Sequence, residues 1–504
     1  MARLHEYQGK RLLSEAGLVV PRGAVASTAE EARRIAGELA GPVVLKIQAW
    51  TTGRKAMGGV AFSDSPGEAA AAARRLLAMK IGAFPVEQVL VEERLPIEHE
   101  VFVSLSIDDA ARRPVLLLAV TGGSGIEERA EQVARIPVNV DGTLEREAIL
   151  TRLAASRIPA SLHAPLADAV AKIAALARRV EARSVEVNPL VTTRDGRVVA
   201  ADCRMTIDDY AVFRHPDLGI DIARELDHPP TALERIAYAI EQADHRGTFY
   251  FAQLPVEPGR PLIGFHGAGG GGSMMSMDAI TAAGFAIANF TDTSGNPSVA
   301  KVYRAARIIL AQPGLVGYFG SGSGVASQEQ FHSAYGLAKA FIEMNLGVPA
   351  VIRLGGNSED RAVEILEGAC RDLPAPVRGF RKDDTPAACA EVFKRLVQQC
   401  GAKPAPMKRA VPAFVGESTS YSFPITGGRV WIDHAACGAA TTQLVIQHSG
   451  GLLREQGGKP VLAISEEEAA GKDSELIACE TECRRAGKPI LFVDLPIQEL
   501  DAAG

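Results

Sequence analysis

The stretch Pro261-Leu-Ile-Gly-Phe-His-Gly-Ala-Gly-Gly-Gly-Gly-Ser-Met-Met275 joins a short apolar run to a glycine cluster and a helix-like segment. This order predicts a strand, a loop and a helix whose first turn is capped by Ser273. Backbone N–H groups and the positive end of the helix dipole would then face one small anion. Residues 267–272 also satisfy Gly-x-Gly-x-x-Gly, but a run this rich in glycine meets that pattern almost automatically. The stretch alone therefore leaves open whether the loop binds phosphate, carboxylate or nothing.

The same pattern of strand, loop and helix repeats downstream. Three further apolar runs are expected to be strands with helices between them: 285–290, 315–319 and 350–354. This repetition predicts a doubly wound, flavodoxin-like parallel sheet, whose ligands gather at the carboxyl ends of the strands. Polar or glycine-rich residues stand at all four of these ends: His266–Gly269, Asn289, Gly320–Gly324 and Gly355–Asn357. Four such loops on one edge favour a binding site.

Composition restricts the class of protein. The chain has 504 residues, enough for several domains, and its 47% hydrophobic and 23% charged content is ordinary for a globular protein. A net charge of −6 argues against a nucleic-acid partner. No apolar run reaches membrane-spanning length, and seven scattered cysteines suit a reducing compartment. We expect a cytoplasmic, multidomain α/β protein with neither a nucleic-acid nor a membrane partner.

A lysine stands inside an apolar strand pattern near the N-terminus. Residues 42–48 are expected to form a buried strand that carries Lys46. A basic, glycine-rich loop (51–59) and a returning strand (60–62) follow it. A lysine in such a strand needs a partner, so Lys46 is a candidate phosphate ligand; the alternative is an edge-strand lysine that reaches water. The three parts together predict a hairpin that closes over a polyphosphate.

Oxygen-bearing side chains mark two later strands. The strands at 185–191 and 198–202, joined by a turn at 194–196, would bring Asn188 and Asp202 close together. Few oxygen ligands of this hard type suit Mg²⁺ held jointly with phosphates. Glu186 stands two residues before Asn188, so both side chains point to the same face of the strand.

A series of ordered motifs covers most of the chain, up to about Leu396. They are Leu4-His-Glu-Tyr-Gln, Lys46, Gly53-Arg-Lys-Ala-Met-Gly-Gly, Val91-Glu92, Glu186-Val-Asn-Pro-Leu-Val with Asp202, His266-Gly-Ala-Gly, Ala288-Asn-Phe and Val351-Ile-Arg-Leu-Gly-Gly-Asn. In this order they resemble the β subunits of succinyl-CoA synthetase, which belong to the superfamily of nucleoside-diphosphate-forming acid–CoA ligases. The resemblance implies an N-terminal ATP-grasp domain that binds Mg²⁺ with ATP or GTP, followed by a CoA-ligase domain.

The resemblance also assigns roles to residues of the first domain. Asn188 and Asp202 match the family's Mg²⁺ ligands, and Glu186 matches the catalytic glutamate that steadies a phosphohistidine. The positions that match its nucleotide-binding residues are Lys46, Gly53, Arg54, Lys55, Glu92, Leu95 and Glu100.

In this family the phosphohistidine and the CoA site belong to an α subunit. The chain carries no match to either, so the resemblance implies one subunit of an αβ or α₂β₂ heteromer that uses CoA as a substrate. The opening loop then becomes a site for the small carboxylic acid. The matching acid-site positions are His266, Gly320, Ser321, Gly322, Ser323, Gly324, Val325 and Ala326.

Departures from the family leave the acid open. His266 replaces an asparagine, and the loop from Gly320 replaces Gly-Gly-Ile-Val. A histidine and two serines are compatible with succinate or with another dianion, such as a sulfonated acid. Two other hypotheses are an ATP-grasp ligase with a non-CoA acyl product and an inactive nucleotide-binding paralogue.

We expect four segments along the chain. They are an ATP-grasp domain (1–225), a CoA-ligase domain (226–401), a linker (402–413) and a small α/β extension (414–504). The extension lies beyond the resemblance, and its loop histidine, His434, is more typical of a surface residue than of a phosphorylation site. The extension could cover a subunit interface or the acid pocket, and its sequence does not decide between these two roles.

Overall fold

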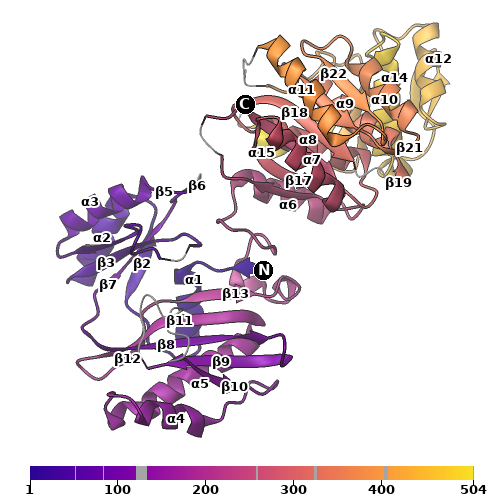
Figure 1. Ribbon diagram of the computed structural model, residues 1–504. Coiled ribbons are helices and arrows are strands. Elements are labelled where there is room, and N and C mark those ends of the chain that lie inside the picture. Colours follow the sequence, from indigo (N-terminus) through magenta and orange to yellow (C-terminus); the bar gives the residue numbers. More distant parts are fainter. Residues whose placement is uncertain are drawn as a thin grey trace. The chain divides into compact units, whose positions relative to one another are not determined.

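A computed structural model describes residues 1–51, 53–82, 84–120, 133–256, 259–322, 326–401 and 407–502. The chain is a mixed α/β protein and divides into two compact units, Met1–Pro230 and Thr231–Gly504 (Figure 1). The predicted boundary at residue 225 lies five residues before this division.

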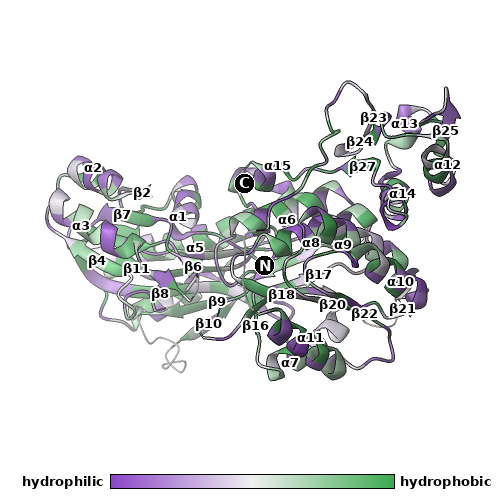
Figure 2. Ribbon diagram, turned by 90° about the horizontal axis from the view of Figure 1, so that it is seen from above, coloured by the Kyte–Doolittle hydropathy of each residue, from purple (hydrophilic) through white to green (hydrophobic). Residues whose placement is uncertain are grey.

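The first unit begins with a small antiparallel sheet in the order β2-β7-β3-β4. Its strands are β2 (Gly23–Ala26), β7 (Val89–Glu93), β3 (Val43–Ile47) and β4 (Val60–Ser63), and helices α2 (Ala29–Leu39) and α3 (Pro66–Leu77) pack on it. Helix α2 starts where Thr28 and Glu31 form a capping box. Apolar and hydrophilic residues alternate around such helices (Figure 2), because one face is buried on the sheet. The predicted hairpin is present, with Lys46 paired to Val60.

A seven-stranded antiparallel sheet completes the first unit, in the order β1-β13-β11-β8-β9-β10, with β12 paired to β11. Its strands are β1 (Ala2–Arg3), β13 (Arg204–Ile207), β11 (Ala182–Thr193), β8 (Ile97–Asp108), β9 (Arg113–Ala119), β10 (Ala134–Pro137) and β12 (Val198–Ala200). Helices α1 (Glu6–Glu15), α4 (Arg146–Ala154) and α5 (His163–Arg179) share its core, in which Val185 and Leu116 are fully buried.

The second unit contains the predicted doubly wound sheet, in the order β14-β17-β15-β18-β20-β22. Its strands are β14 (Tyr250–Gln253), β17 (Asn289–Asp292), β15 (Leu262–Ala268), β18 (Leu315–Gly322), β20 (Ala350–Arg353) and β22 (Val377–Phe380), and all but β14 run parallel. Adjacent residues Tyr318 and Phe319 enter different apolar clusters, since successive side chains of a strand face opposite sides. Helices cover both faces: α7 (Gly270–Ala282) and α11 (Pro386–Cys400) on one, α8 (Val299–Leu310), α9 (Phe331–Glu343) and α10 (Glu359–Cys370) on the other.

The N-cap of helix α7 lies four residues before the predicted one. Its N-cap is Gly269, whose φ of 100° favours glycine, and residues 270–272 join the first turn. Ser273 therefore lies inside the helix, where its N–H and Oγ both donate to the Gly269 carbonyl, at 3.0 and 2.8 Å. The prediction of Ser273 as the cap is wrong because this hydroxyl bonds backward into the preceding turn. Asp292 Oδ1 accepts from Gly269 N at 2.9 Å.

Residues 407–502 pack into the same apolar cluster as α8, α9 and α10. They form a three-stranded antiparallel sheet, β23 (Ser420–Ile425), β24 (Gly428–Asp433) and β27 (Leu491–Asp494), with helices α12 (Ala439–His448) and α14 (Asp473–Arg485) and a hairpin of β25 (Leu453–Gln456) and β26 (Lys459–Leu462). His434 stacks on Tyr421 with ring centroids 5.3 Å apart, and its Nε2 lies 2.8 Å from the Pro460 carbonyl oxygen.

Candidate nucleotide and acid sites

Lys46 lies in a cluster of buried charges that joins the two sheets of the first unit. We call this set the ion cluster; its members are Glu6, Lys10, Lys46, Arg54, Glu92 and Asp202. Lys46 Nζ lies 2.8 Å from Glu6 Oε1 and 3.0 Å from Glu92 Oε2, and only 13% of its side chain is exposed. Strand β3 lies between β7 and β4, so the alternative of an edge-strand lysine is wrong. Although burial acts in the opposite direction, the neighbouring carboxylates raise the pKa of Lys46.

Helix α1 supplies two members of the ion cluster that sequence reasoning did not assign. Lys10 Nζ lies 2.7 Å from Glu6 Oε1, one turn away, and 2.6 Å from Glu92 Oε1. Burial alone would raise the pKa of Glu6, but Lys10, Lys46 and Arg54 hold it well below its usual range. The available signal was a carboxylate and a lysine at i, i+4 on a helix, a pattern that usually marks exposed pairs.

Arg54 links the glycine-rich loop to a predicted metal ligand. One guanidinium nitrogen lies 2.6 Å from Glu6 Oε2, and the other lies 2.8 Å from Asp202 Oδ2. Gly53 and Gly58 have φ of 66° and 79°, which explains the glycines that flank this turn. Lys55 is exposed in the same loop.

The expected metal ligands lie side by side, Asn188 on β11 and Asp202 two residues after the end of β12. Leu190 pairs with Ala200, and Ala201 N donates to Pro189 O at 3.1 Å, so the register carries Asp202 alongside Asn188. Glu186 and Asn188 lie on the less buried face of β11, since Val185 and Val187, which alternate with them, are fully buried. This donor set of carboxylate and amide oxygens fits Mg²⁺. Within the described ranges, no cluster of three or more His, Cys, Asp or Glu side chains forms a metal site.

The remaining predicted nucleotide residues lie on the adjoining strands. Glu92 is buried in the ion cluster, where its carboxylate contacts both Lys10 and Lys46. In this structure Glu92 therefore positions the Lys46 side chain. Leu95 packs on Val191, Val199 and Ala201. Glu100 pairs with Val191 across β8 and β11. A cavity beside the ion cluster is lined by residues that include Glu6, Trp50, Arg54 and Arg204.

The predicted acid-site residues from His266 to Gly322 lie at the carboxyl ends of β15 and β18. His266 pairs with Gly320, and a Cβ at Gly320 would stand 2.9 Å from Ile352 Cδ1. Ser321 and Gly322 end β18, and Ser321 Oγ lies 2.6 Å from Ser276 Oγ on α7. Ser323, Gly324 and Val325 lie outside the described residues, and Ala326 begins β19 (Ala326–Glu329).

His266 is buried, and both of its ring nitrogens have partners. Nδ1 lies 2.5 Å from the Tyr318 hydroxyl, and Nε2 lies 2.8 Å from Thr293 Oγ1. Burial lowers the pKa of His266 to about 4. The neutral ring therefore orients Thr293 at the strand edge, and a direct contact between His266 and the acid stays a prediction.

This buried histidine should make the second unit sensitive to acid. Because its pKa falls from 6.5 to about 4 on folding, the neutral form stabilises the fold above pH 6.5, and this contribution is lost as the pH falls toward 4. We expect wild type to lose up to about 1.4 kcal/mol per pH unit more than H266Q across this window. Urea unfolding at several pH values, followed by Trp431 fluorescence in a W50F background, measures the difference. The exposed-histidine control H245Q should behave as wild type; equal slopes in wild type and H266Q would contradict the assignment.

Comparisons with known proteins place this arrangement in a family. Residues 3–192 match the ATP-grasp domain family. The chain is 34% identical over 370 residues to a GDP-forming succinate–CoA ligase β subunit from Thermus thermophilus. The alignment covers 72% of this chain and 93% of that relative. The chain belongs to the family of succinate–CoA ligase β subunits. The chain is also 35% identical over 378 residues to an ADP-forming succinate–CoA ligase β subunit from Streptomyces coelicolor. This alignment covers 73% of this chain and 92% of that relative.

A solved structure supports the fold of this β-subunit family member. The structure of ATP citrate lyase from Methanothrix soehngenii superposes on this protein with a TM-score of 0.61 and 17% sequence identity. The match covers 78% of this protein and 99% of the ATP citrate lyase chain. The predicted fold class, an ATP-grasp domain followed by a parallel-sheet domain, is therefore confirmed, and so is the class of acid–CoA ligase. No helix in the described ranges is long and apolar enough to cross a membrane.

Proposed function

We propose that the chain is the β subunit of an NDP-forming acid–CoA ligase that acts with an α subunit carrying the phosphohistidine and the CoA site. The observation that carries this proposal is the ion cluster. It holds Lys46 and Arg54 beside Asp202, on strands and loops of an ATP-grasp domain. Phosphoryl transfer depends mainly on such positioned positive charge.

Each residue of the site would then act on charge or orientation. Lys46, Arg54 and the loop amides would neutralise the nucleotide phosphates. Asn188 and Asp202 would hold Mg²⁺, which supplies charge neutralisation and fixes the phosphate geometry when bound. Asp202 can take this role only after Arg54 leaves its carboxylate. Glu186 would accept a hydrogen bond from one imidazole nitrogen of the partner, which keeps the other nitrogen nucleophilic.

The proposed reaction balances over three transfers. The γ-phosphoryl group passes from ATP or GTP to the partner's histidine, leaving NDP. The phosphohistidine then phosphorylates the acid's carboxylate, and CoA thiolate displaces phosphate to form the thioester. The acid would bind at the carboxyl ends of β15 and β18, where His266 and Ser321 lie. Succinate and other small dianions, sulfonated acids among them, are the candidates. We place the enzyme in the cytoplasm, as an αβ or α₂β₂ heteromer.

CoA-dependent release of NDP tests this function. The chain is co-purified with its α partner and assayed with ATP or GTP against small mono- and dianionic acids. We expect release that needs both the acid and CoA, and none from the chain alone. NDP release that needs an amine acceptor and ignores CoA would favour the non-CoA ligase, and no release with any α partner would favour the inactive paralogue.

A further inference from the structure

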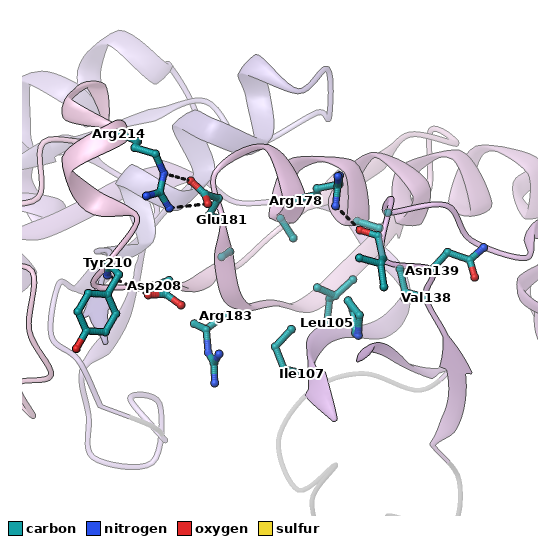
Figure 3. Close-up of a pocket in the computed structure, with 16 residues that line it drawn as sticks. Leu105, Ile107, Val138, Asn139, Arg178, Glu181, Arg183, Asp208, Tyr210 and Arg214 are labelled. Atoms are coloured by element: carbon teal, nitrogen blue, oxygen red, sulfur yellow. Dashed lines mark hydrogen bonds and ion pairs between the residues drawn. The ribbon is translucent and has the colours of Figure 1, made fainter. Parts of the chain in front are cut away.

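A second cavity lies at one end of the seven-stranded sheet of the first unit (Figure 3). Its volume is about 400 Å³, within the range of roughly 300–1,000 Å³ that small-molecule sites occupy. Its walls are the end of α5, the segment after β10 and the segment after β13. Ser184 pairs with Ser106 at this end of β11 and β8, whereas Glu100 pairs with Val191 toward the other. The cavity is therefore separate from the candidate nucleotide residues.

The floor of this cavity is apolar, and its rim exposes large apolar side chains. Leu105, Val138 and Ala177 line the floor. At the rim, Val140 is 73% and Tyr210 86% exposed. These two side chains extend the apolar lining of the cavity to its mouth.

One of the two carboxylates that line the cavity is already neutralised. Glu181 accepts from Arg214 Nε and Nη2 at 2.9 and 2.7 Å, and His215 Nε2 lies 2.9 Å from Glu181 Oε2. The hydrogen bonds from Arg214 and then from His215 lower the pKa of Glu181 to about 2. Glu181 is thus a fixed part of the wall.

Positive charge is in excess over the apolar floor. Asp208 Oδ1 accepts from Tyr210 N at 3.0 Å. Arg178 donates to the Val140 carbonyl, and Arg183 also lines the cavity. In the part of the chain that the structure describes, no carboxylate forms an ion pair with Arg183, whereas Arg178 interacts electrostatically with the Asp141 carboxylate. Figure 3 shows the Arg183 side chain extending free of the dashed interactions that tie Arg214 and Arg178.

We propose that this cavity binds a small organic anion with an apolar chain. The carboxylate would lie on the Arg183 guanidinium, whose planar fork matches two carboxylate oxygens. The chain would cover Leu105, Val138 and Ala177 and be enclosed by Val140 and Tyr210. This site goes beyond the proposed reaction, since its ligand touches no residue assigned to nucleotide, metal or acid.

Isothermal titration of the full chain with three probes tests the site. Octanoate has both the charge and the apolar chain, butanoate has the charge with a short chain, and octyl glucoside has the chain without the charge. We expect octanoate to bind one to one and butanoate at least about tenfold more weakly, because four buried methylenes are lost. R183Q should weaken octanoate by about tenfold or more, since a charge-assisted hydrogen-bonded pair is removed. A177F should abolish binding by filling the floor, with circular dichroism confirming its fold.

Two controls separate this site from the others. R194Q changes an exposed arginine just beyond the far end of the same strand and should leave octanoate affinity unchanged. Saturating Mg-ATP should also leave it unchanged. Equal octanoate binding by wild type, R183Q and A177F would overturn the proposal, as would loss of binding on adding Mg-ATP. Octyl glucoside binding as tightly as octanoate, or no octanoate binding at all, would overturn it too.

Discussion

Replacing Lys46 with alanine should reduce phosphoryl transfer to the partner by about 10²–10³-fold, the usual effect of removing one positioned charge from a reacting centre. The Lys46 Nζ lies between Glu6 and Glu92 on a buried strand. Water therefore cannot take the place of its positive charge in the variant. Transfer of label from [γ-³²P]ATP to the α subunit measures the effect. The control K80A removes an exposed lysine of the same unit and should retain full transfer.

Loss of activity in K46A has a competing explanation, because the variant leaves a buried carboxylate short of a partner. Breaking such a cluster costs about 3–5 kcal/mol of unfolding free energy. The double variant K46A/E92Q removes one charge of each sign and should recover part of the stability. If the double variant folds and remains inactive while E92Q alone retains transfer, Lys46 acts on the phosphates. Recovery of transfer in the double variant, or normal transfer in K46A, would refute its proposed role.

Replacing Glu343 with alanine should destabilise the second unit by about 3–5 kcal/mol. Glu343 is 1% exposed; Lys339 Nζ lies 2.5 Å from its Oε1, and Arg409 Nε lies 2.9 Å from its Oε2. Arg409 also lies 2.6 Å from Asp494 on β27. Removing Glu343 therefore takes one of two close carboxylates from Arg409 and from Lys339, whose other partner is Glu480 at 2.7 Å, within a buried cluster between α9 and the C-terminal extension.

Urea unfolding followed by Trp431, which lies on β24, measures this effect in the W50F background. The matched control is E364A, because Glu364 pairs with Arg485 at 2.7 Å but is 73% exposed. We expect the control to cost less than about 1 kcal/mol. An E343A cost no larger than that of E364A would mean that the extension is held by apolar contacts alone.

The elements most accessible from the sequence were those with strong local patterns. The apolar run around Lys46 and the repeated strand–loop–helix segments after Pro261 predict a hairpin and a doubly wound sheet, and the structure contains both. Local patterning suffices there because each strand is buried by helices close to it in the chain.

The members of the ion cluster were harder to predict from the sequence. Glu6 and Lys10 have the spacing of an exposed helix pair, and only the packing of α1 against both sheets buries them. The contact between Arg54 and Asp202 joins residues 148 positions apart, which no local pattern encodes. The start of α7 was missed for a different reason. Residues 270–272 are glycines, which favour a loop, but they form the first turn of the helix, and Ser273 Oγ donates to the Gly269 carbonyl across this turn.

The products of the complete reaction test the central claim most directly. The co-purified heteromer is given nucleotide, CoA and the best acid, and the products are resolved by chromatography with label on the α- and γ-phosphates. We predict equal amounts of acyl-CoA, NDP and inorganic phosphate, with the γ-label appearing transiently as an acid-labile adduct on the α subunit. Formation of AMP and pyrophosphate, or of acyl-CoA without any labelled α subunit, would contradict the proposed mechanism.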